Sequence, residues 1–261
     1  MSEKVLMKGN EAIGEAAIRS GCKHFFGYPI TPQTELSAYM AKKMPKIGGV
    51  FLQAESELAA VNMVYGAASA GVRAMTSSSS PGISLKAEGI SYIAAADLPC
   101  VIVNIVRGGP GLGGIQPAQS DYFQATKGGG HGDYHLIVLA PNSVQELVYL
   151  TSDAFNLSEE YRIPVMLLGD GTLGQMMEPV DFDSMPEPVW SEKPWATDGT
   201  QNKREKNVTK TLFLDAPELE AVVMEREKKY DVVKKELQRY EAHDIEDADI
   251  IISSYGITSR V

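Results

Sequence analysis

The feature that most constrains the fold is a regular alternation of two hydrophobic patterns between residues 10 and 169. Segments with apolar residues three and four positions apart are typical of helices, and the short apolar runs between them are typical of buried strands. The predicted helices cover 11–21, 32–44, 56–71, 81–96 and 143–161, and the predicted strands cover 23–29, 48–54, 72–77, 99–106, 136–141 and 164–170. Such alternation predicts an α/β fold, a doubly wound and mainly parallel sheet with helices on both faces.

The pattern breaks after residue 178. A proline-rich connector and a long charged helix are predicted over 179–245, with the helix at 217–243 solvated or docked on the domain. Residues 246–261 resemble the first strand and turn of another α/β unit, which is too short to fold alone. We therefore expect an α/β domain over 1–178 in the front part of a longer polypeptide.

Composition narrows the class of function. A net charge of −10 argues against nucleic acid or an anionic membrane as partner, because neither is bound without a basic face. The two cysteines, Cys22 and Cys100, are too few for a disulfide framework or an iron–sulfur cluster on this chain, and a reduced cytoplasm fits them. No apolar run of membrane-spanning length and no export signal is visible.

Three motifs resemble binding sites, but a structural role explains each of them better. Gly109, Gly111 and Gly114 have dinucleotide-loop spacing, but the next predicted strand ends without the acidic residue that NAD binding requires. The 169–171 GDG matches the start of a magnesium–diphosphate motif but lacks a downstream asparagine at suitable distance, so a strand-end turn is favoured. The histidines and aspartate of 131–135 match no common zinc spacing, and no metal site is predicted.

Unusual polar segments follow three of the predicted strands. These segments are YPITP at 28–32, TSSSSPG at 76–82 and RGGPGLGG at 107–114. Parallel sheets bind ligands beyond the carboxyl ends of their strands, so these segments are expected to lie together at the site. Two prolines stiffen Thr31 within the first of them.

Glu55 and Glu57 lie just beyond a fourth strand, in the first turn of a helix rich in small residues. A helix start alone explains a carboxylate, because the helix dipole favours negative charge there. The small residues Ala59, Ala60, Gly66, Ala67 and Ala70 would also permit close packing against another element. The two glutamates are about 200° apart around a helix, so only one of them can reach a given ligand.

Taken together, these motifs resemble one family, the 2-oxoacid:ferredoxin oxidoreductases. Glu57, Ala60 and Gly66 resemble the glutamate pattern of the pyrimidine-binding domain of thiamine-diphosphate enzymes, and 28–32, 76–82, 107–110 and 131–133 follow in the family's order. The similarity extends over nearly the whole chain and is strongest to the branched-chain type, which acts on 3-methyl-2-oxobutanoate (ketoisovalerate). Where many relatives have glycine before the proline of the 76–82 turn, this chain has Ser80.

The resemblance implies a role for each matching residue. Glu57 would bind the aminopyrimidine of thiamine diphosphate and activate it, and Pro29 would contact the cofactor. Thr31 and Arg107 would bind the 2-oxoacid, since a guanidinium donates two parallel hydrogen bonds to a carboxylate.

The resemblance also implies a multisubunit enzyme with coenzyme A and ferredoxin as co-substrates. A beta-type partner subunit would bind the diphosphate and magnesium, a ferredoxin-like subunit would carry the iron–sulfur clusters, and a gamma-type subunit would complete the complex. Two alternatives stay open: a relative that acts on 2-oxoglutarate or another 2-oxoacid, and a non-catalytic scaffold subunit whose main surface is the 217–243 helix.

Overall fold

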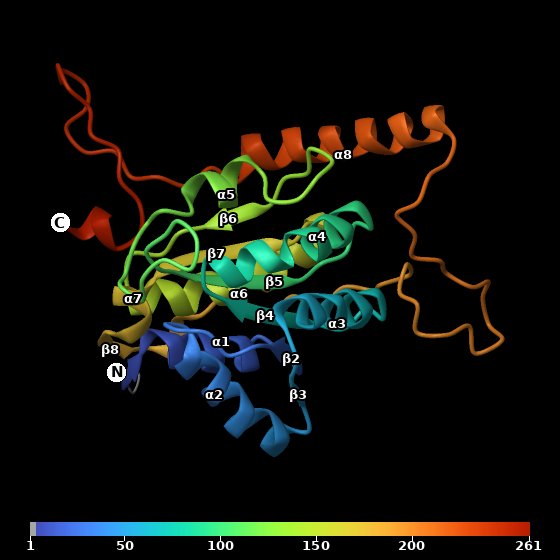
Figure 1. Cartoon of the computed structure of the whole chain (residues 1–261), viewed down its shortest axis with the longest axis horizontal. Coiled ribbons are helices and arrows are strands. Elements are labelled where there is room, and N and C mark those ends of the chain that lie inside the picture. The colour runs from blue at the N-terminus through green and yellow to red at the C-terminus, as the bar shows by residue number, and fades with distance from the viewer. Residues whose placement is uncertain (1–3) are drawn as a thin grey trace.

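A six-stranded parallel sheet forms the centre of the protein. The computed structural model describes residues 4–261, and the strand order is β3-β2-β4-β5-β7-β6 (Figure 1). The strands are β2 (His24–Gly27), β3 (Val50–Gln53), β4 (Ala74–Ser78), β5 (Val101–Val106), β6 (Ile137–Leu139) and β7 (Val165–Asp170). The predicted α/β class is confirmed, and all six strands occur where the apolar runs predicted them.

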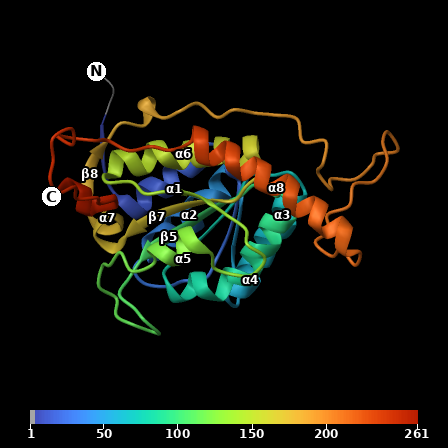
Figure 2. The ribbon, with the colours of Figure 1, turned by 90° about the horizontal axis from the view of Figure 1, so that it is seen from above.

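Helices cover both faces of this sheet (Figure 2). One face packs against α1 (Gly9–Arg19), α2 (Thr34–Lys43) and α6 (Val144–Tyr161), and the other against α3 (Glu57–Ser69), α4 (Pro81–Ala95) and α5 (Tyr122–Lys127). A 3₁₀ turn, η1 (Met44–Ile47), follows α2. Successive residues of β5 alternate between the two cores, as the period of a strand requires.

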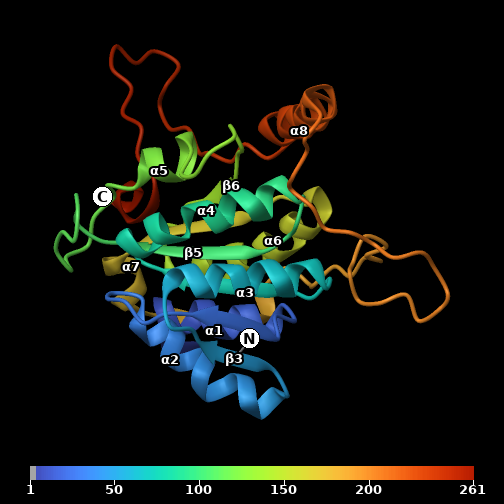
Figure 3. The same ribbon diagram turned by 45° about the vertical axis from the view of Figure 1, so that its right-hand side comes forward.

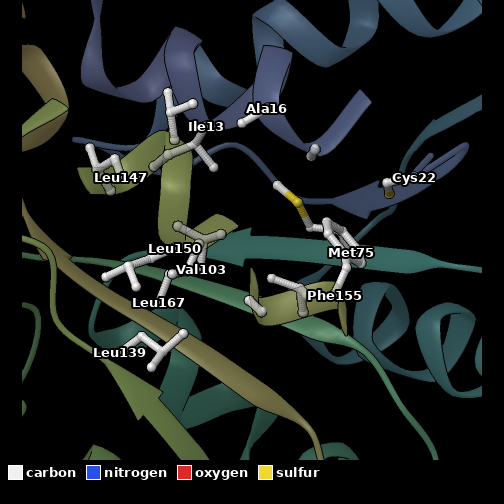
Figure 4. Close-up of a cluster of buried hydrophobic side chains, with 14 of the residues drawn as sticks. Ile13, Ala16, Cys22, Met75, Val103, Leu139, Leu147, Leu150, Phe155 and Leu167 are labelled. Carbon is white, nitrogen blue, oxygen red and sulfur yellow. The ribbon is translucent and has the colours of Figure 1, made fainter. Parts of the chain in front are cut away.

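The core on the α1, α2 and α6 face is continuous. Ile13 of α1 and Leu147 of α6 meet Val103 and Leu167, which project from the adjacent strands β5 and β7 (Figure 4). All six residues of each of these strands are buried. Because the middle of the sheet is held so firmly, the loops at its carboxyl edge start from fixed positions.

A second, two-stranded sheet was missed by the sequence analysis. β1 (Val5–Lys8) pairs antiparallel with β8 (Met177–Val180), which follows the short helix α7 (Gly171–Gln175). β8 straddles the predicted end of the domain at residue 178, and it contains Pro179, which is compatible with a strand only at the edge of a sheet. The pairing of β1 with β8 places residues 5–8 next to residues 177–180, at the end of the α/β domain.

The connector after β8 begins with the 3₁₀ turn η2 (Phe182–Ser184) and is fastened to the domain by Arg73. The Arg73 guanidinium donates to the carbonyls of Ser20 at 2.6 Å and Val189 at 2.5 Å, and its carbon lies 4.4 Å from the ring centre of Trp190. It also forms a buried ion pair with Glu159. Farther on, residues of the connector extend away from the sheet before the chain returns (Figures 1 and 3).

The long helix α8 (Ala216–Glu236) docks on the domain. Lys229 donates to Asp97 at 2.5 Å, Arg226 donates to the Ala95 carbonyl, and the buried Tyr230 ring meets His135 edge-on at 5.0 Å. The helix ends at Glu236, seven residues before the predicted end at 243, so residues 237–243 have no helical structure.

The predicted strand near the end of the chain is absent. Residues 250–252 are exposed isoleucines without regular structure, because no neighbouring strand pairs with them, and the 3₁₀ turn η3 (Gly256–Arg260) follows. Tyr255 and Gln119 exchange two hydrogen bonds, at 2.8 and 3.0 Å, that hold this end against the domain. A second α/β domain stays a prediction. Within residues 4–261, no helix has the length and apolar content needed to cross a membrane.

Candidate active site

Four neighbouring strands place the predicted site residues at one edge of the sheet. β3, β2, β4 and β5 are consecutive in the sheet order, and all run parallel. The polar segments that leave their carboxyl ends therefore emerge side by side. Glu57 follows β3, Thr31 follows β2, Gly82 follows β4 and Arg107 follows β5.

Glu57 is the first residue of α3 and its carboxylate is unpaired. Ser56 caps this helix by accepting the Ala59 amide at 3.1 Å, so the main-chain donors of the first turn are partly satisfied without the glutamate. Glu57 is only 6% exposed, and among the described residues no group donates a hydrogen bond to its carboxylate. A buried carboxylate that lacks a donor in the protein is poised to accept one from a ligand.

Gly82 forms a close wall beside that carboxylate. A Cβ atom at Gly82 would lie 2.8 Å from Glu57 Oε1 and 2.0 Å from Ser78 Oγ, so only glycine allows these three residues to approach one another. The hydroxyls of Ser78 and Ser79 are also buried without a hydrogen-bond partner. Unpaired polar atoms from α3 and from the end of β4 thus lie on both sides of Gly82.

Lys86, one turn beyond Gly82 on α4, is a buried cation that the sequence analysis missed. Its Nζ donates to Thr76 Oγ1 at 2.6 Å and to the Ser77 carbonyl at 3.0 Å. Burial lowers the pKa of Lys86 to about 7, although the charge of Glu57 acts in the opposite direction. The available signal was a lysine at position 86 within the otherwise apolar buried stripe of 83, 90 and 93.

Arg107 lies at the end of β5 with its guanidinium turned toward two main-chain carbonyls. It donates to Thr31 O at 3.0 Å and to Leu112 O at 2.9 Å, while its Nε is buried without a partner. The glycine-rich loop folds back over the arginine, because Gly114 N donates to Gly108 O at 2.9 Å. Arg107 is 6% exposed in this arrangement.

Ser80 holds the main chain of Arg107. Its hydroxyl accepts the Arg107 amide at 3.0 Å and donates to the Arg107 carbonyl at 3.2 Å. The Ser80 amide in turn donates to Asn104 Oδ1 at 3.1 Å. Ser80 has φ +33°, a backbone conformation that is strained for any residue with a side chain. The two hydrogen bonds to Arg107 offset this strain, which a glycine at position 80 would not have.

The loop that carries Pro29 and Thr31 is held by a buried side chain as well as by its prolines. Gln33 accepts the Ser77 hydroxyl at 2.6 Å and donates to the Tyr28 carbonyl at 3.1 Å. Pro29 and Thr31 are themselves exposed at the strand end. The structure thus brings Thr31 to Arg107 through the threonine carbonyl, a contact that the sequence analysis did not predict.

The three motifs that received a structural interpretation adopt ordinary local structures. Asp170 of the GDG caps α7, accepting the amides of Thr172 at 2.8 Å and Leu173 at 3.0 Å. The 108–114 loop does not open a helix. His131 lies 3.4 Å from Ser91 Oγ in a loop that is mostly exposed, and residues 4–261 contain no cluster of three or more acidic, histidine or cysteine side chains arranged to hold a metal.

The expected small-residue face of α3 is only partly used for packing. Ala60 is buried, but Gly66 is exposed, and a Cβ there would meet nothing within 4 Å. α3 packs against α4 at Val61 instead. A Cβ atom on Gly89 of α4 would lie only 2.4 Å from Val61 Cγ1. The helical period explains the difference, because residue 66 lies well around the helix from the buried positions 57, 61, 64 and 68.

A parallel α/β sheet with an unpaired buried carboxylate at its carboxyl edge defines a ligand-binding domain of the doubly wound class. A family model described as pyruvate flavodoxin/ferredoxin oxidoreductase, thiamine-diphosphate-binding, matches residues 15–255. The chain belongs to this family and is a subunit of a 2-oxoacid:ferredoxin oxidoreductase. The family resemblance inferred from the motifs is confirmed.

Individual relatives agree with this assignment. The chain is 51% identical to the ketoisovalerate oxidoreductase subunit VorB of Methanothermobacter marburgensis over 98% of its own length and 72% of that protein. It is 49% identical to the 2-oxoglutarate synthase subunit KorA of Methanothermobacter thermautotrophicus over 69% of this chain and 48% of that one.

A solved structure shares the fold. The 2-oxoglutarate:ferredoxin oxidoreductase from Magnetococcus marinus, determined with 2-oxoglutarate, coenzyme A and succinyl-CoA bound, superposes with a TM-score of 0.84 at 31% identity. The match covers 94% of this chain and 47% of the other. The chain therefore spans about half the length of that relative.

Proposed function

We propose that this chain is the pyrimidine-domain subunit of an oxidoreductase that converts a branched 2-oxoacid and coenzyme A into acyl-CoA and carbon dioxide, with the released electrons passed to ferredoxin. The observation that carries the proposal is the Glu57 carboxylate, which is buried at a helix start and accepts no hydrogen bond from the described protein. A carboxyl group in that condition is suited to bind the ring nitrogen of an aminopyrimidine.

The residues present fit the pyrimidine end of thiamine diphosphate. Gly82 lets α4 approach Glu57 closely, and the Ser78 hydroxyl, which is buried without a hydrogen-bond partner, lies beside the glycine. When bound, thiamine diphosphate supplies the carbanion that attacks the 2-oxoacid and takes up the electrons of decarboxylation. Glu57 would hold the proton at the ring nitrogen, and Pro29, exposed at the end of β2, would border the ring.

We assign the diphosphate end of the cofactor no ligands among residues 4–261. Asp170, the acidic residue of the GDG sequence, already uses its Oδ1 to cap α7. We propose that a beta-type partner subunit binds the diphosphate and magnesium, that a ferredoxin-like subunit carries the iron–sulfur clusters, and that a gamma-type subunit completes the assembly. The cofactor would then lie between two chains.

Arg107 and Thr31 are the proposed substrate-binding residues. The buried Nε of Arg107 has no partner, and the bond of Arg107 to Leu112 O could be exchanged for a carboxylate oxygen if the glycine-rich loop opens. The Thr31 carbonyl would keep the guanidinium oriented during that exchange. The exposed Thr31 hydroxyl would then face the 2-oxoacid from the neighbouring loop.

The preference for a branched substrate is supported by the 51% identity to the VorB subunit named above. The KorA relative and the Magnetococcus structure support 2-oxoglutarate as the second candidate. Arg107 and Thr31 would contact only groups that all 2-oxoacids share, so they do not discriminate. Steady-state assays of the assembled complex with 3-methyl-2-oxobutanoate and with 2-oxoglutarate decide between the two substrates through their kcat/KM ratio.

The role of Glu57 is tested by Glu57→Gln in the assembled complex, with Glu55→Gln as the matched control. Glu55 is exposed and lies two residues earlier in the chain, before the start of α3, so the first-turn position expected for it is wrong. Glu57→Gln should lower decarboxylation by at least about 100-fold, because a glutamine cannot exchange a proton with the ring, whereas Glu55→Gln should leave it near normal. Near-normal turnover with Glu57→Gln, together with unchanged affinity for thiamine diphosphate in Glu57→Ala, would support the scaffold alternative.

A further inference from the structure

We propose that Asn10, a fully buried residue in the first turn of α1, is a positioning residue for substrate binding, because it fixes the loop of residues 28–33 that carries Thr31. The inference rests on the proposed function, in which Thr31 and Arg107 bind the 2-oxoacid. Asn10 is assigned no contact with substrate or cofactor. It acts through the main chain on the carboxyl side of Thr31.

The Asn10 amide divides its two donors between this loop and the helix that follows it. Nδ2 donates to the Pro32 carbonyl at 2.8 Å and to Glu35 Oε2 at 2.9 Å. Pro32 belongs to the loop, and Glu35 lies in the first turn of α2. One side chain of α1 therefore holds the loop and the start of α2 at the same point.

The neighbours of the Asn10 amide set its orientation. Its Oδ1 is buried and has no hydrogen-bond partner among residues 4–261. The reverse orientation would turn this oxygen toward a carbonyl and a carboxylate, which only accept hydrogen bonds. On the other side, a Cβ atom at Gly174 of α7 would lie 2.8 Å from Oδ1 and 3.2 Å from Nδ2, so only glycine lets α7 pack against the amide. Because an unpaired buried oxygen is costly, the asparagine is explained by its two donors.

The main chain after Thr31 is held at two consecutive carbonyls. The Thr31 carbonyl accepts from Arg107 of β5 at 3.0 Å, and the Pro32 carbonyl accepts from Asn10 of α1 at 2.8 Å. The proline ring also fixes φ between these two carbonyls. The direction in which the Thr31 side chain leaves the main chain is therefore set before a substrate arrives.

Loss of the Asn10 amide should weaken binding of the 2-oxoacid more than that of coenzyme A. With the Pro32 carbonyl released, the loop would gain conformations in which Thr31 is turned away from the Arg107 guanidinium. The apparent affinity for the 2-oxoacid falls with the fraction of molecules in such conformations. Coenzyme A is assigned no contact with this loop.

The first test is initial-rate kinetics of Asn10→Ala in the assembled complex, with each substrate varied in turn. We expect the KM for the 2-oxoacid to rise about fivefold or more and the KM for coenzyme A to change less than about twofold. Asn207→Ala is the matched control, because its Nδ2 also donates to two carbonyls, those of Pro194 and Ala196, but in the connector. It should leave both KM values unchanged. Equal changes in the two KM values of Asn10→Ala, or no change, would overturn the inference.

The second test separates the loop contact from the helix contact by exchanging the side chains at 10 and 35. Asn10→Asp places two carboxylates together and leaves the Pro32 carbonyl without its donor, so it should lower the melting midpoint and raise the KM for the 2-oxoacid. Adding Glu35→Gln restores an amide–carboxylate pair with its roles reversed and keeps one carboxylate beside Lys8, which pairs with Glu35 at 3.5 Å.

In this double variant the Pro32 carbonyl still faces an acceptor. The double variant should therefore regain most of the lost melting midpoint but keep the raised KM. Recovery of both quantities would mean that Asn10 acts only by joining α1 to α2, and the positioning role would be wrong.

A third measurement needs no substrate. Hydrogen–deuterium exchange of the full chain should show amides of residues 28–34 exchanging about threefold faster or more in Asn10→Ala, with those of β5 unchanged. If Asn10→Ala folds poorly, Gly174→Ala takes its place, because the added Cβ would displace the Asn10 amide without removing it. Unchanged exchange of 28–34 in a folded variant would contradict the proposal.

The outcomes separate this inference from the proposed function. If Arg107→Lys raises the KM for the 2-oxoacid and Asn10→Ala does not, the substrate-binding role of Arg107 stands and the role of Asn10 is wrong. If neither variant changes that KM, the proposed substrate-binding role of Thr31 and Arg107 is itself wrong.

Discussion

The guanidinium of Arg107 donates to the main-chain carbonyl of Thr31 at 3.0 Å and so joins the ends of β5 and β2, two strands that are separated in the sheet by β4. The link crosses the carboxyl edge where the site lies. It sets the distance between the two proposed substrate-binding residues without using the threonine hydroxyl. Thr31 is exposed, and the Arg107 Nε is buried without a hydrogen-bond partner.

Arg107→Lys should raise the KM for the 2-oxoacid by about tenfold or more, with a smaller effect on the KM for coenzyme A. A lysine cannot bridge two carbonyls and a carboxylate in one plane, as a guanidinium does. Initial-rate kinetics of the assembled complex with each substrate varied in turn provide the measurement. Arg204→Lys, at a partly exposed ion pair with Asp198, is the control. Equal effects on the two KM values would contradict a substrate-binding role.

Gly82→Ala should weaken thiamine-diphosphate binding and lower the stability of the chain, while Gly66→Ala should not. The alanine Cβ at 82 would overlap Ser78 Oγ and press on Glu57 Oε1, whereas at 66 it would meet open space. Alanine at an exposed helical position stabilises by roughly 0.5–1 kcal/mol relative to glycine. Urea denaturation of the chain and calorimetric titration of the complex with the cofactor compare the two variants. A Gly82→Ala variant that binds the cofactor normally would contradict the proposed need for glycine beside Glu57.

Ser80→Ala should destabilise the protein more than Ser80→Gly does. Both changes remove the hydroxyl that bonds the amide and carbonyl of Arg107, but glycine relieves the strained φ of +33° and alanine retains it. A difference of about 1 kcal/mol or more is expected in the free energy of unfolding, measured by urea titration. If the two variants are equally stable, the backbone at Ser80 is not strained.

Lys86 should make the stability of the protein depend on pH above neutrality. Its pKa is lowered to about 7 in the folded state from an ordinary value of 10.5, so between these limits the unfolded chain binds a proton that the folded chain does not. Raising the pH through this window therefore stabilises the wild type relative to Lys86→Met, by up to about 1.4 kcal/mol per pH unit. Below pH 7 the difference should level off, because Lys86 is protonated in both states.

Paired urea denaturation of the wild type and Lys86→Met, from about pH 6 to about pH 9, gives the difference directly. Other titrating groups cancel, since they are shared by the two proteins. Parallel stability curves over the whole range would mean that Lys86 titrates normally in spite of its burial.

The local elements of this protein were predictable from sequence because their signals are local. Each of the five predicted helices from 11 to 161 and each of the six parallel strands is specified by its own hydrophobic period and its own glycine or proline boundary. The errors fall where a neighbour decides the outcome. β8 forms because β1 is there to pair with it, and the 250–252 segment forms no strand because it has no such neighbour.

The candidate site shows the same division. Sequence alone determined that Glu57, Thr31 and Arg107 follow strands of one parallel sheet, which is sufficient to place them at one edge. Only the tertiary structure decided that the Thr31 carbonyl orients Arg107, that Gly82 lets α4 approach Glu57 closely, and that Lys86 is buried. Such contacts depend on strand order and helix rotation, which arise from packing across the whole sheet and leave no periodic signal in any one segment.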